Sequence, residues 1–205
     1  MFDLRAQLDA VRRRVHAGEG GDRLVVRLER SCPAAPGALW AALTEPARLG
    51  RWFLPVSGDL REGGSFAAEG NADGTILTCD PAKRLVLTWG AAESVVTIEL
   101  ASAGAGSTDL VLEHSVPAAF VPDAGGALYV GPGWDGALLG LGLYLDGFEP
   151  EDPSAFQNSP EVLEYNAGSI AEWENALRAS GLATDAQIDA AVQAATANYT
   201  VLPEG

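Results

Sequence analysis

The chain has 205 residues, of which 47% are hydrophobic, and this is enough for one domain with a sizeable core. Its formal net charge is -15, and nearly all the excess negative charge lies beyond Arg84, where Arg178 is the only cation. Nucleic acid is therefore excluded as a partner, because a phosphate backbone requires clustered cations. The acidity either keeps the protein in solution or lets the acidic half dock a basic partner or the chain's own arginine-rich start.

The two cysteines, Cys32 and Cys79, occur without a CxxC spacing. We recognise no secretory leader and no apolar run long enough to span a bilayer. Neither a disulfide framework nor a membrane anchor is indicated, so a cytoplasmic location is expected.

The opening residues, 1–18, are predicted to form one amphipathic helix that ends at Gly18. Aliphatic side chains recur there at helical spacing, at Leu4, Leu8, Val11 and Val15. Arginines occupy mainly the other faces. Such a basic helix either packs against its own acidic domain or lies on a membrane or in a partner's groove.

The main domain is predicted over residues 22–148 and begins with a half-buried strand at 23–30. Two short helices follow, at 38–43 and 46–51. Six further alternating segments are separated by short turns, at 56–60, 65–69, 75–79, 85–89, 95–100 and 108–114. Turns this short join antiparallel strands, so we expect an antiparallel meander of seven strands.

A long apolar helix is predicted from Trp134 to about Phe148, after a loop rich in Ala, Pro and Gly. A helix this apolar must be covered on most sides, and a sheet that curls over it would do so. Residues 149–205 are predicted to be a helical extension packed on the domain. It contains one helix at 160–180 and a last helix that begins at Thr184, with Gln187 completing a capping box.

Six stretches of the chain resemble the START-like, or SRPBCC, superfamily, in the branch named for homologues of the heat-shock-protein-90 ATPase activator. They are LWAALT at 39–44, RWFLP at 51–55, GDLREGG at 58–64, GNADGTI at 70–76, TW at 88–89 and GWDGAL at 133–138. The resemblance covers residues 22–148 and rests on the order of these motifs, since each one alone is weak.

This resemblance implies an α+β helix-grip fold, in which a seven-stranded curved antiparallel sheet surrounds a long C-terminal helix, with extra N- and C-terminal helices. It also implies a cavity between sheet and helix that binds small molecules or, in some members, catalyses cyclisation or dehydration. It does not imply a chaperone role, because kinship at the level of the fold does not establish function.

Few residues suggest catalysis. The histidines are His16 and His114, no His or Cys pair has the spacing of metal ligands, and no phosphate-binding loop is present, so neither a metal nor a cofactor is expected. By alternation His114 shares a face with Leu110 and Leu112. It acts either as an acid or base in the groove or as a core histidine bonded to a carbonyl or to an acid such as Asp135.

The predicted ligand-binding residues combine this histidine with large apolar side chains at inward-facing positions. They are Trp52, Phe53, Phe66, Ile76, Leu87, Trp89, His114, Leu138, Leu141, Tyr144 and Leu145. For each aromatic residue, core packing is the alternative to ligand contact. Tyr144 or Glu69 would help His114 to orient a ligand.

Three small residues are interpreted separately. Gly140 and Gly142 leave volume on the long helix, which serves either close packing or a pocket. Cys79 is either a small buried hydrophobe or a thiol activated by nearby cations.

Three functions follow from these observations. The leading hypothesis is a binding protein for a small apolar or amphipathic molecule. The alternatives are an enzyme like a polyketide cyclase or dehydratase, which would use His114 with a carboxylate, and a co-chaperone-like interaction protein that docks through its acidic tail. A homodimer or a protein partner is left open.

Overall fold

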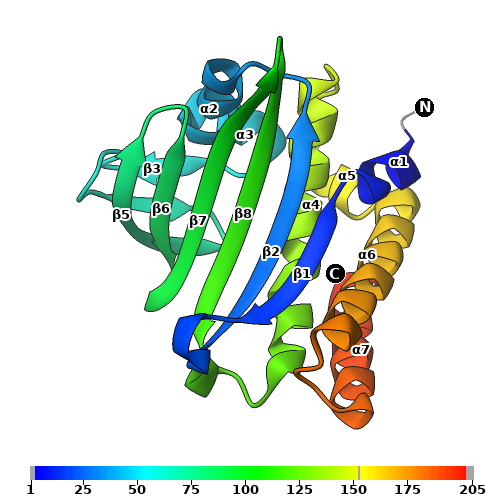
Figure 1. The fold of residues 1–205 in the computed structure, drawn as a ribbon. Helices are drawn as coiled ribbons and strands as arrows, with labels where there is room; N and C mark the ends of the chain where they lie inside the picture. The colour runs from blue at the N-terminus through cyan, green and yellow to red at the C-terminus, as the bar shows by residue number, and fades with distance from the viewer. Residues whose placement is uncertain (1–2, 152, 202–205) are drawn as a thin grey trace.

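The computed structural model describes residues 3–151 and 153–201, which build one antiparallel sheet of eight strands (Figure 1). The strand order is β1-β2-β8-β7-β6-β5-β4-β3. The strands are β1 (Arg12–Ala17), β2 (Arg23–Cys32), β3 (Val56–Gly58), β4 (Ser65–Ala68), β5 (Ala72–Asp80), β6 (Arg84–Trp89), β7 (Ala91–Gly104) and β8 (Ser107–Pro117).

Helices accompany the sheet at both ends of the chain and between its first strands. They are α1 (Leu4–Asp9), α2 (Pro36–Thr44), α3 (Pro46–Trp52), α4 (Ala127–Leu145), α5 (Pro153–Gln157), α6 (Pro160–Ser180) and α7 (Asp185–Tyr199), with short 3-10 turns η1 (Glu19–Gly21), η2 (Ala118–Phe120) and η3 (Ala124–Gly126). The expected α+β class, with a curved antiparallel sheet and a long helix, is confirmed.

The expected count of seven strands is wrong, because residues 12–17 form strand β1 instead of continuing the first helix. The helix ends at Asp9, and β1 pairs with β2 at the edge of the sheet. Val11 and Val15 are four residues apart, a spacing that helices and strands share. The side chain between them on the buried face is Arg13, and this buried charge hid the two-residue alternation of a strand.

The long helix α4 begins at Ala127 instead of Trp134 and ends at Leu145. Residues 131–133, Gly-Pro-Gly, predict a loop, since proline lacks an amide donor and glycine is a poor helix former. The helix continues through them because of its packing. A Cβ at Gly131 would lie 2.5 Å from the ring of Trp173, so only glycine lets α6 approach so closely.

The half of the sheet that contains β3–β6 is bent. In Figure 1 α4 lies behind β2, while β3 and β4 fold behind β5 and β6. The register between β5 and β6 shifts between Ile76 and Thr78, and a Cβ at Gly74 would lie 2.1 Å from the carbonyl oxygen of Thr88. A bulge and a glycine at a close crossing bend a strand, so this half of the sheet turns towards α3 and α4.

A buried ion pair joins the N-terminal strand to α4. Arg13 donates through Nε to Oδ2 of Asp135 at 2.8 Å, and the two side chains are 4% and 0% exposed. The same carboxylate oxygen accepts hydrogen bonds from the hydroxyl of Ser169 and the indole of Trp173, both on α6. Burial raises the pKa of Asp135, while these three donors oppose the rise. One carboxylate therefore holds β1, α4 and α6 together.

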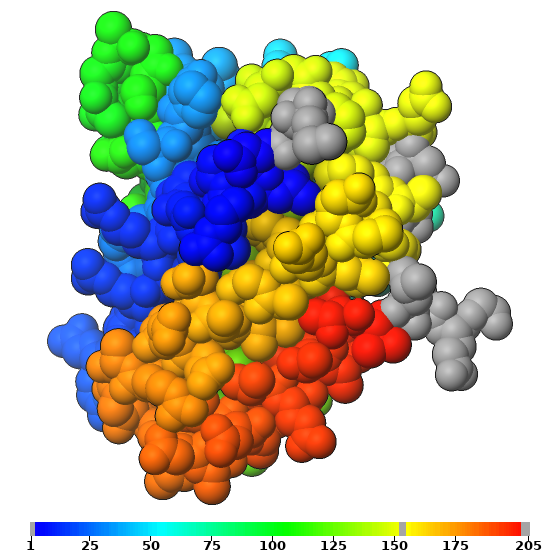
Figure 2. Space-filling view, turned by 90° about the vertical axis from the view of Figure 1, so that its right-hand side faces the viewer, coloured from blue at the N-terminus to red at the C-terminus, as the bar shows by residue number. Residues whose placement is uncertain are grey.

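The C-terminal helices α6 and α7 each begin at a side-chain cap, Ser159 and Thr184. The Thr184 hydroxyl accepts the amide hydrogen of Gln187, and the Gln187 side chain accepts that of Thr184, which is the predicted capping box. Figure 2 shows the N-terminal segment in blue against α6, with α7 in red beside it, and α6 also contacts β1. Within residues 3–151 and 153–201, no helix combines the length and the apolarity that crossing a bilayer requires.

Replacing Arg13 by methionine is expected to lower the free energy of unfolding by about 3–5 kcal/mol, because the buried carboxylate of Asp135 loses its cation. The matched control is Arg14→Met at the neighbouring exposed position, for which we expect a change below about 0.5 kcal/mol. Urea denaturation of both variants measures the difference. Equal losses in the two variants would show that the buried pair does not hold β1 on α4.

Candidate functional site

An apolar hollow of about 140 Å³, which we name the inner cavity, lies between the bent half of the sheet and helices α2–α4. Strands β3–β8 supply aliphatic and aromatic side chains from one side. The end of α3 and the middle of α4 supply the opposite side, through Trp52, Trp134, Ala137 and Leu138. The inner cavity thus lies where the bent half of the sheet faces α3 and α4.

One wall of the inner cavity is a row of aromatic rings. Trp89 of β6 lies at its centre, with ring centroids 5.7 Å from Phe66, 5.1 Å from Trp134 and 6.4 Å from Phe53. These separations are typical of packed aromatic pairs. The row therefore ties the sheet to α4 and to the end of α3, and it offers flat apolar surfaces to a ligand.

The protein itself uses three polar groups of the cavity lining. The indole of Trp52 and the hydroxyl of Thr44 donate to backbone carbonyls of α2, at 3.0 and 2.8 Å. The indole of Trp134 donates to Nδ1 of His114 at 3.0 Å. A buried water needs two to four polar partners, so these engaged groups favour a dry cavity.

A second hollow, which we name the outer pocket, has a volume of about 200 Å³ and borders the inner cavity at Phe53, Trp89, Trp134 and Ala137. His114 lines the outer pocket and not the inner cavity. The outer pocket is the more polar of the two, because its lining also includes Asn71, Tyr129 and Tyr199.

Both ring nitrogens of His114 are engaged. The Trp134 indole can only donate, so Nδ1 must accept, and we assign the proton of the neutral ring to Nε2. Nε2 then donates to the Ser94 hydroxyl at 2.7 Å. The predicted acidic partner, Asp135, bonds instead to Arg13, Ser169 and Trp173, so that expectation is wrong.

The environment of His114 keeps its imidazole neutral. The side chain is 4% exposed, and burial, together with the smaller effect of the positive charge on Arg23, lowers its pKa to about 4. A neutral ring with both nitrogens engaged is well suited to fixing Trp134 and poorly placed to exchange a proton with a substrate. The alternation that put His114 on the face of Leu110 and Leu112 is confirmed.

The structure brings seven of the predicted ligand-binding residues to the inner cavity, namely Trp52, Phe53, Phe66, Ile76, Leu87, Trp89 and Leu138. Leu141 is fully buried in the core. The ring of Tyr144 packs under the guanidinium of Arg51, at 5.5 Å, and Leu145 lies against the main core. Glu69 is exposed beyond β4, outside the lining of both hollows.

Several lining residues were missed by the sequence prediction. Val96 and Ile98 of β7 alternate as the strands do, so that signal was present in the sequence. Ala137 carried no signal, since an alanine on a helix is not distinctive. Asn71 and Tyr199 lie far apart in the sequence and meet only through the fold.

Gly140 and Gly142 serve close packing and line neither the inner cavity nor the outer pocket, although Gly140 borders a further pocket beside α3. A Cβ at Gly140 would lie 2.5 Å from the carbonyl oxygen of Trp52. A Cβ at Gly142 would lie 2.4 Å from the guanidinium of Arg30, which donates to the Leu138 carbonyl of α4. The missing side chains on α4 therefore admit α3 and a buried arginine of β2.

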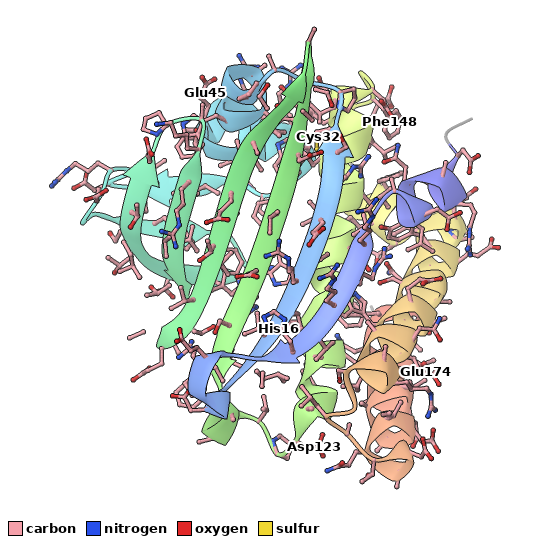
Figure 3. The ribbon with its side chains drawn as sticks, in the orientation of Figure 1. His16, Cys32, Glu45, Asp123, Phe148 and Glu174 are labelled. Atoms are coloured by element: carbon pink, nitrogen blue, oxygen red, sulfur yellow. The ribbon has the colours of Figure 1, made fainter. Side chains whose placement is uncertain are left out.

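The two cysteines and His16 lie at separate places in the fold. Cys79 lines the inner cavity, whereas Cys32 is buried at the end of β2, where burial raises the pKa of its thiol (Figure 3). His16 lies on β1, at the opposite edge of the sheet from β3 (Figure 3). Among residues 3–151 and 153–201, no group of three or more His, Cys, Asp or Glu side chains could hold a metal ion.

The low pKa of His114 makes a testable contribution to stability. Below pH 6.5 the unfolded chain binds a proton at His114, whereas the folded chain does so only near pH 4, so the folded state loses stability as the pH falls through this window. Between pH 7 and pH 5 the unmodified protein is expected to lose about 2 kcal/mol more than His114→Gln, measured by urea denaturation at each pH. Parallel curves for the two proteins would contradict the assignment.

A family model, "Activator of Hsp90 ATPase homolog 1-like protein", matches residues 33–146, which is more than half of the chain. The match spans α2 to α4 and so includes both sides of the inner cavity. A comparison with curated proteins found no match.

Solved structures show the same architecture. The crystal structure of CalU16 from Micromonospora echinospora is 30% identical, with a TM-score of 0.66 over 82% of this chain and 99% of that one. DynU16, described as a protein in the dynemicin biosynthetic locus, is 26% identical, with a TM-score of 0.55 over 62% of this chain and 48% of that one. An HSP90 activator from Plasmodium falciparum, 23% identical, with a TM-score of 0.51 over 62% and 97% of the two chains, shares the fold. The family-model match and the likeness to CalU16 in fold and sequence lead to the same conclusion. The chain belongs to the family of Activator of Hsp90 ATPase homolog 1-like proteins, within the SRPBCC superfamily.

Proposed function

We propose that the protein binds a small apolar molecule in the inner cavity. The observation that carries this proposal is the cavity itself, about 140 Å³ of space walled by aliphatic and aromatic side chains, where Thr44, Trp52 and Trp134 already have hydrogen-bond partners within the protein. An engineered cavity of about 150 Å³ with a similar lining stays dry and binds benzene. The inner cavity therefore suits a group the size of one aromatic ring.

The energetic argument supports a bound ligand. Side chains that line an unfilled hollow lack the packing contacts of a filled core, so an empty inner cavity weakens this end of the fold. An apolar ligand supplies those contacts and loses its own contact with water. Both effects favour occupancy without any hydrogen bond from the protein.

The geometry favours binding over catalysis. A cyclase or dehydratase would need an acid–base pair that faces the substrate, but His114 contacts Ser94 and Trp134, and both its nitrogens are engaged. The description of DynU16 places that protein in a biosynthetic locus, which supports a small-molecule role for this protein too. The likeness to the Plasmodium falciparum HSP90 activator concerns the fold and does not favour a co-chaperone role.

Toluene is expected to raise the melting temperature of the protein. At a concentration ten times its dissociation constant, a ligand adds about 1.4 kcal/mol of stability, or roughly 3 °C for a chain of this length. Ala68→Phe, which adds a ring at a buried position of β4 that lines the inner cavity and neither neighbouring hollow, is expected to abolish the shift. Ala171→Phe, at an exposed position of α6, is the matched control and should retain it.

The shift is followed by differential scanning fluorimetry, with circular dichroism to confirm that both variants are folded. If toluene leaves the melting temperature of the unmodified protein unchanged, or shifts Ala68→Phe as much as Ala171→Phe, the inner cavity is not a binding site.

A further inference from the structure

Three hollows meet around one phenyl ring. Besides the inner cavity and the outer pocket, a lateral pocket of about 320 Å³ lies between α3, α4 and the C-terminal helices. Phe53 and Ala137 are the lining residues that all three share. Ala137 presents only a methyl group, so the ring of Phe53 is the one large side chain that borders all three hollows. The inner cavity and the outer pocket also share Trp89 and Trp134, whose rings pack against each other.

Phe53 combines a fixed backbone with a side chain that no hydrogen bond restrains. Its amide donates to the carbonyl of Leu49 at 2.8 Å, which anchors it to the end of α3. The segment at 53–55 that follows belongs to neither helix nor strand. The ring is half-buried and rests 5.5 Å from Trp52 and 6.4 Å from Trp89. Rotation about its own side-chain bonds would therefore open the partition without breaking a hydrogen bond.

The walls continue across this partition. Trp89 and Trp134 line both the inner cavity and the outer pocket, and their centroids are 5.1 Å apart. The outer pocket then adds the polar groups of Asn71 and Tyr129, of which Tyr129 is 72% exposed. Aromatic surface thus runs without a break from the core to a polar mouth.

The charge of the lining limits the chemistry of the occupant. Among the described residues that line these two hollows, none is an Asp, Glu, Lys or Arg, and His114 is held neutral. A charged group buried here without a partner would cost several kcal/mol. The occupant must therefore be neutral along its buried length.

We infer that Phe53 is the partition of one elongated site, whose ligand is a neutral, flat molecule of more than one ring with a polar end at Asn71 and Tyr129. This inference rests on the proposed function and extends it from the inner cavity to the outer pocket. Together the two hollows offer about 340 Å³, within the size range of small-molecule sites. The inner cavity alone holds a single ring.

Two probes of different length test the partition. Toluene matches the inner cavity, and N-phenyl-1-naphthylamine, a neutral three-ring fluorophore, requires both hollows. Phe53→Ala is expected to tighten binding of the fluorophore by about tenfold, because the open arrangement no longer has to be selected from a closed one. Phe53→Trp enlarges the partition and is expected to weaken that binding by about threefold or more.

Toluene and a neighbouring truncation provide the controls. Leu54→Ala removes a side chain that lines only the lateral pocket. The affinity of this variant for the fluorophore should therefore equal that of the unmodified protein. Toluene affinity should change less than fluorophore affinity in both Phe53 variants. Fluorescence titration and calorimetry give the dissociation constants, and circular dichroism checks folding. Phe53→Trp retains a large ring and so keeps the test available if Phe53→Ala does not fold.

The possible results separate the two proposals. If toluene binds but the affinity for the fluorophore does not change with the size of residue 53, the partition is overturned and the proposed function stands. If neither probe binds any of the four proteins, both are overturned. A graded response, in which the affinity falls from Phe53→Ala through the unmodified protein to Phe53→Trp, supports the partition.

Discussion

The arrangement of the site depends on one buried carboxylate. Asp135 lies next to Trp134 in α4, so the two side chains leave the helix in directions about 100° apart. Asp135 is held by Arg13 from β1 and by Ser169 and Trp173 from α6. These bonds fix the orientation of α4 about its own axis. In that orientation Trp134 faces the sheet and completes the aromatic row. The N- and C-terminal segments, outside the residues matched by the family model, thus set the orientation of the helix that carries one wall of the cavity.

The inner cavity and the closest packing contacts lie on different faces of α4. At Gly131 and Gly142 the missing side chains admit Trp173 and Arg30, which fix the helix against α6 and β2. The inner cavity lies on another face of the helix, where Trp134, Ala137 and Leu138 face the bent half of the sheet. Packing is therefore tight where α4 must be held and loose where the sheet turns over it.

Local patterns in the sequence were sufficient for most of the sheet. Alternation and short turns located the strands from β2 to β8, and a Thr184 capping box located α7. Strand β1 was missed because its inward residue is Arg13, whose burial depends on a carboxylate 122 positions away. The start of α4 was missed because Pro132 and its flanking glycines predict a loop, and only packing against Trp173 makes them helical. The wall of the inner cavity was predicted in part, since alternation marks inward residues but gives neither Ala137 nor the polar mouth.

The central claim is that a dry, apolar space lies between Phe66, Trp89 and Leu138. A crystal structure determined under xenon pressure measures this most directly, because xenon enters apolar cavities that water avoids. We expect a xenon atom within contact distance of these three side chains, with the protein otherwise unchanged. Side chains packed through that space, or ordered water in it, would contradict a binding cavity between the sheet and α4.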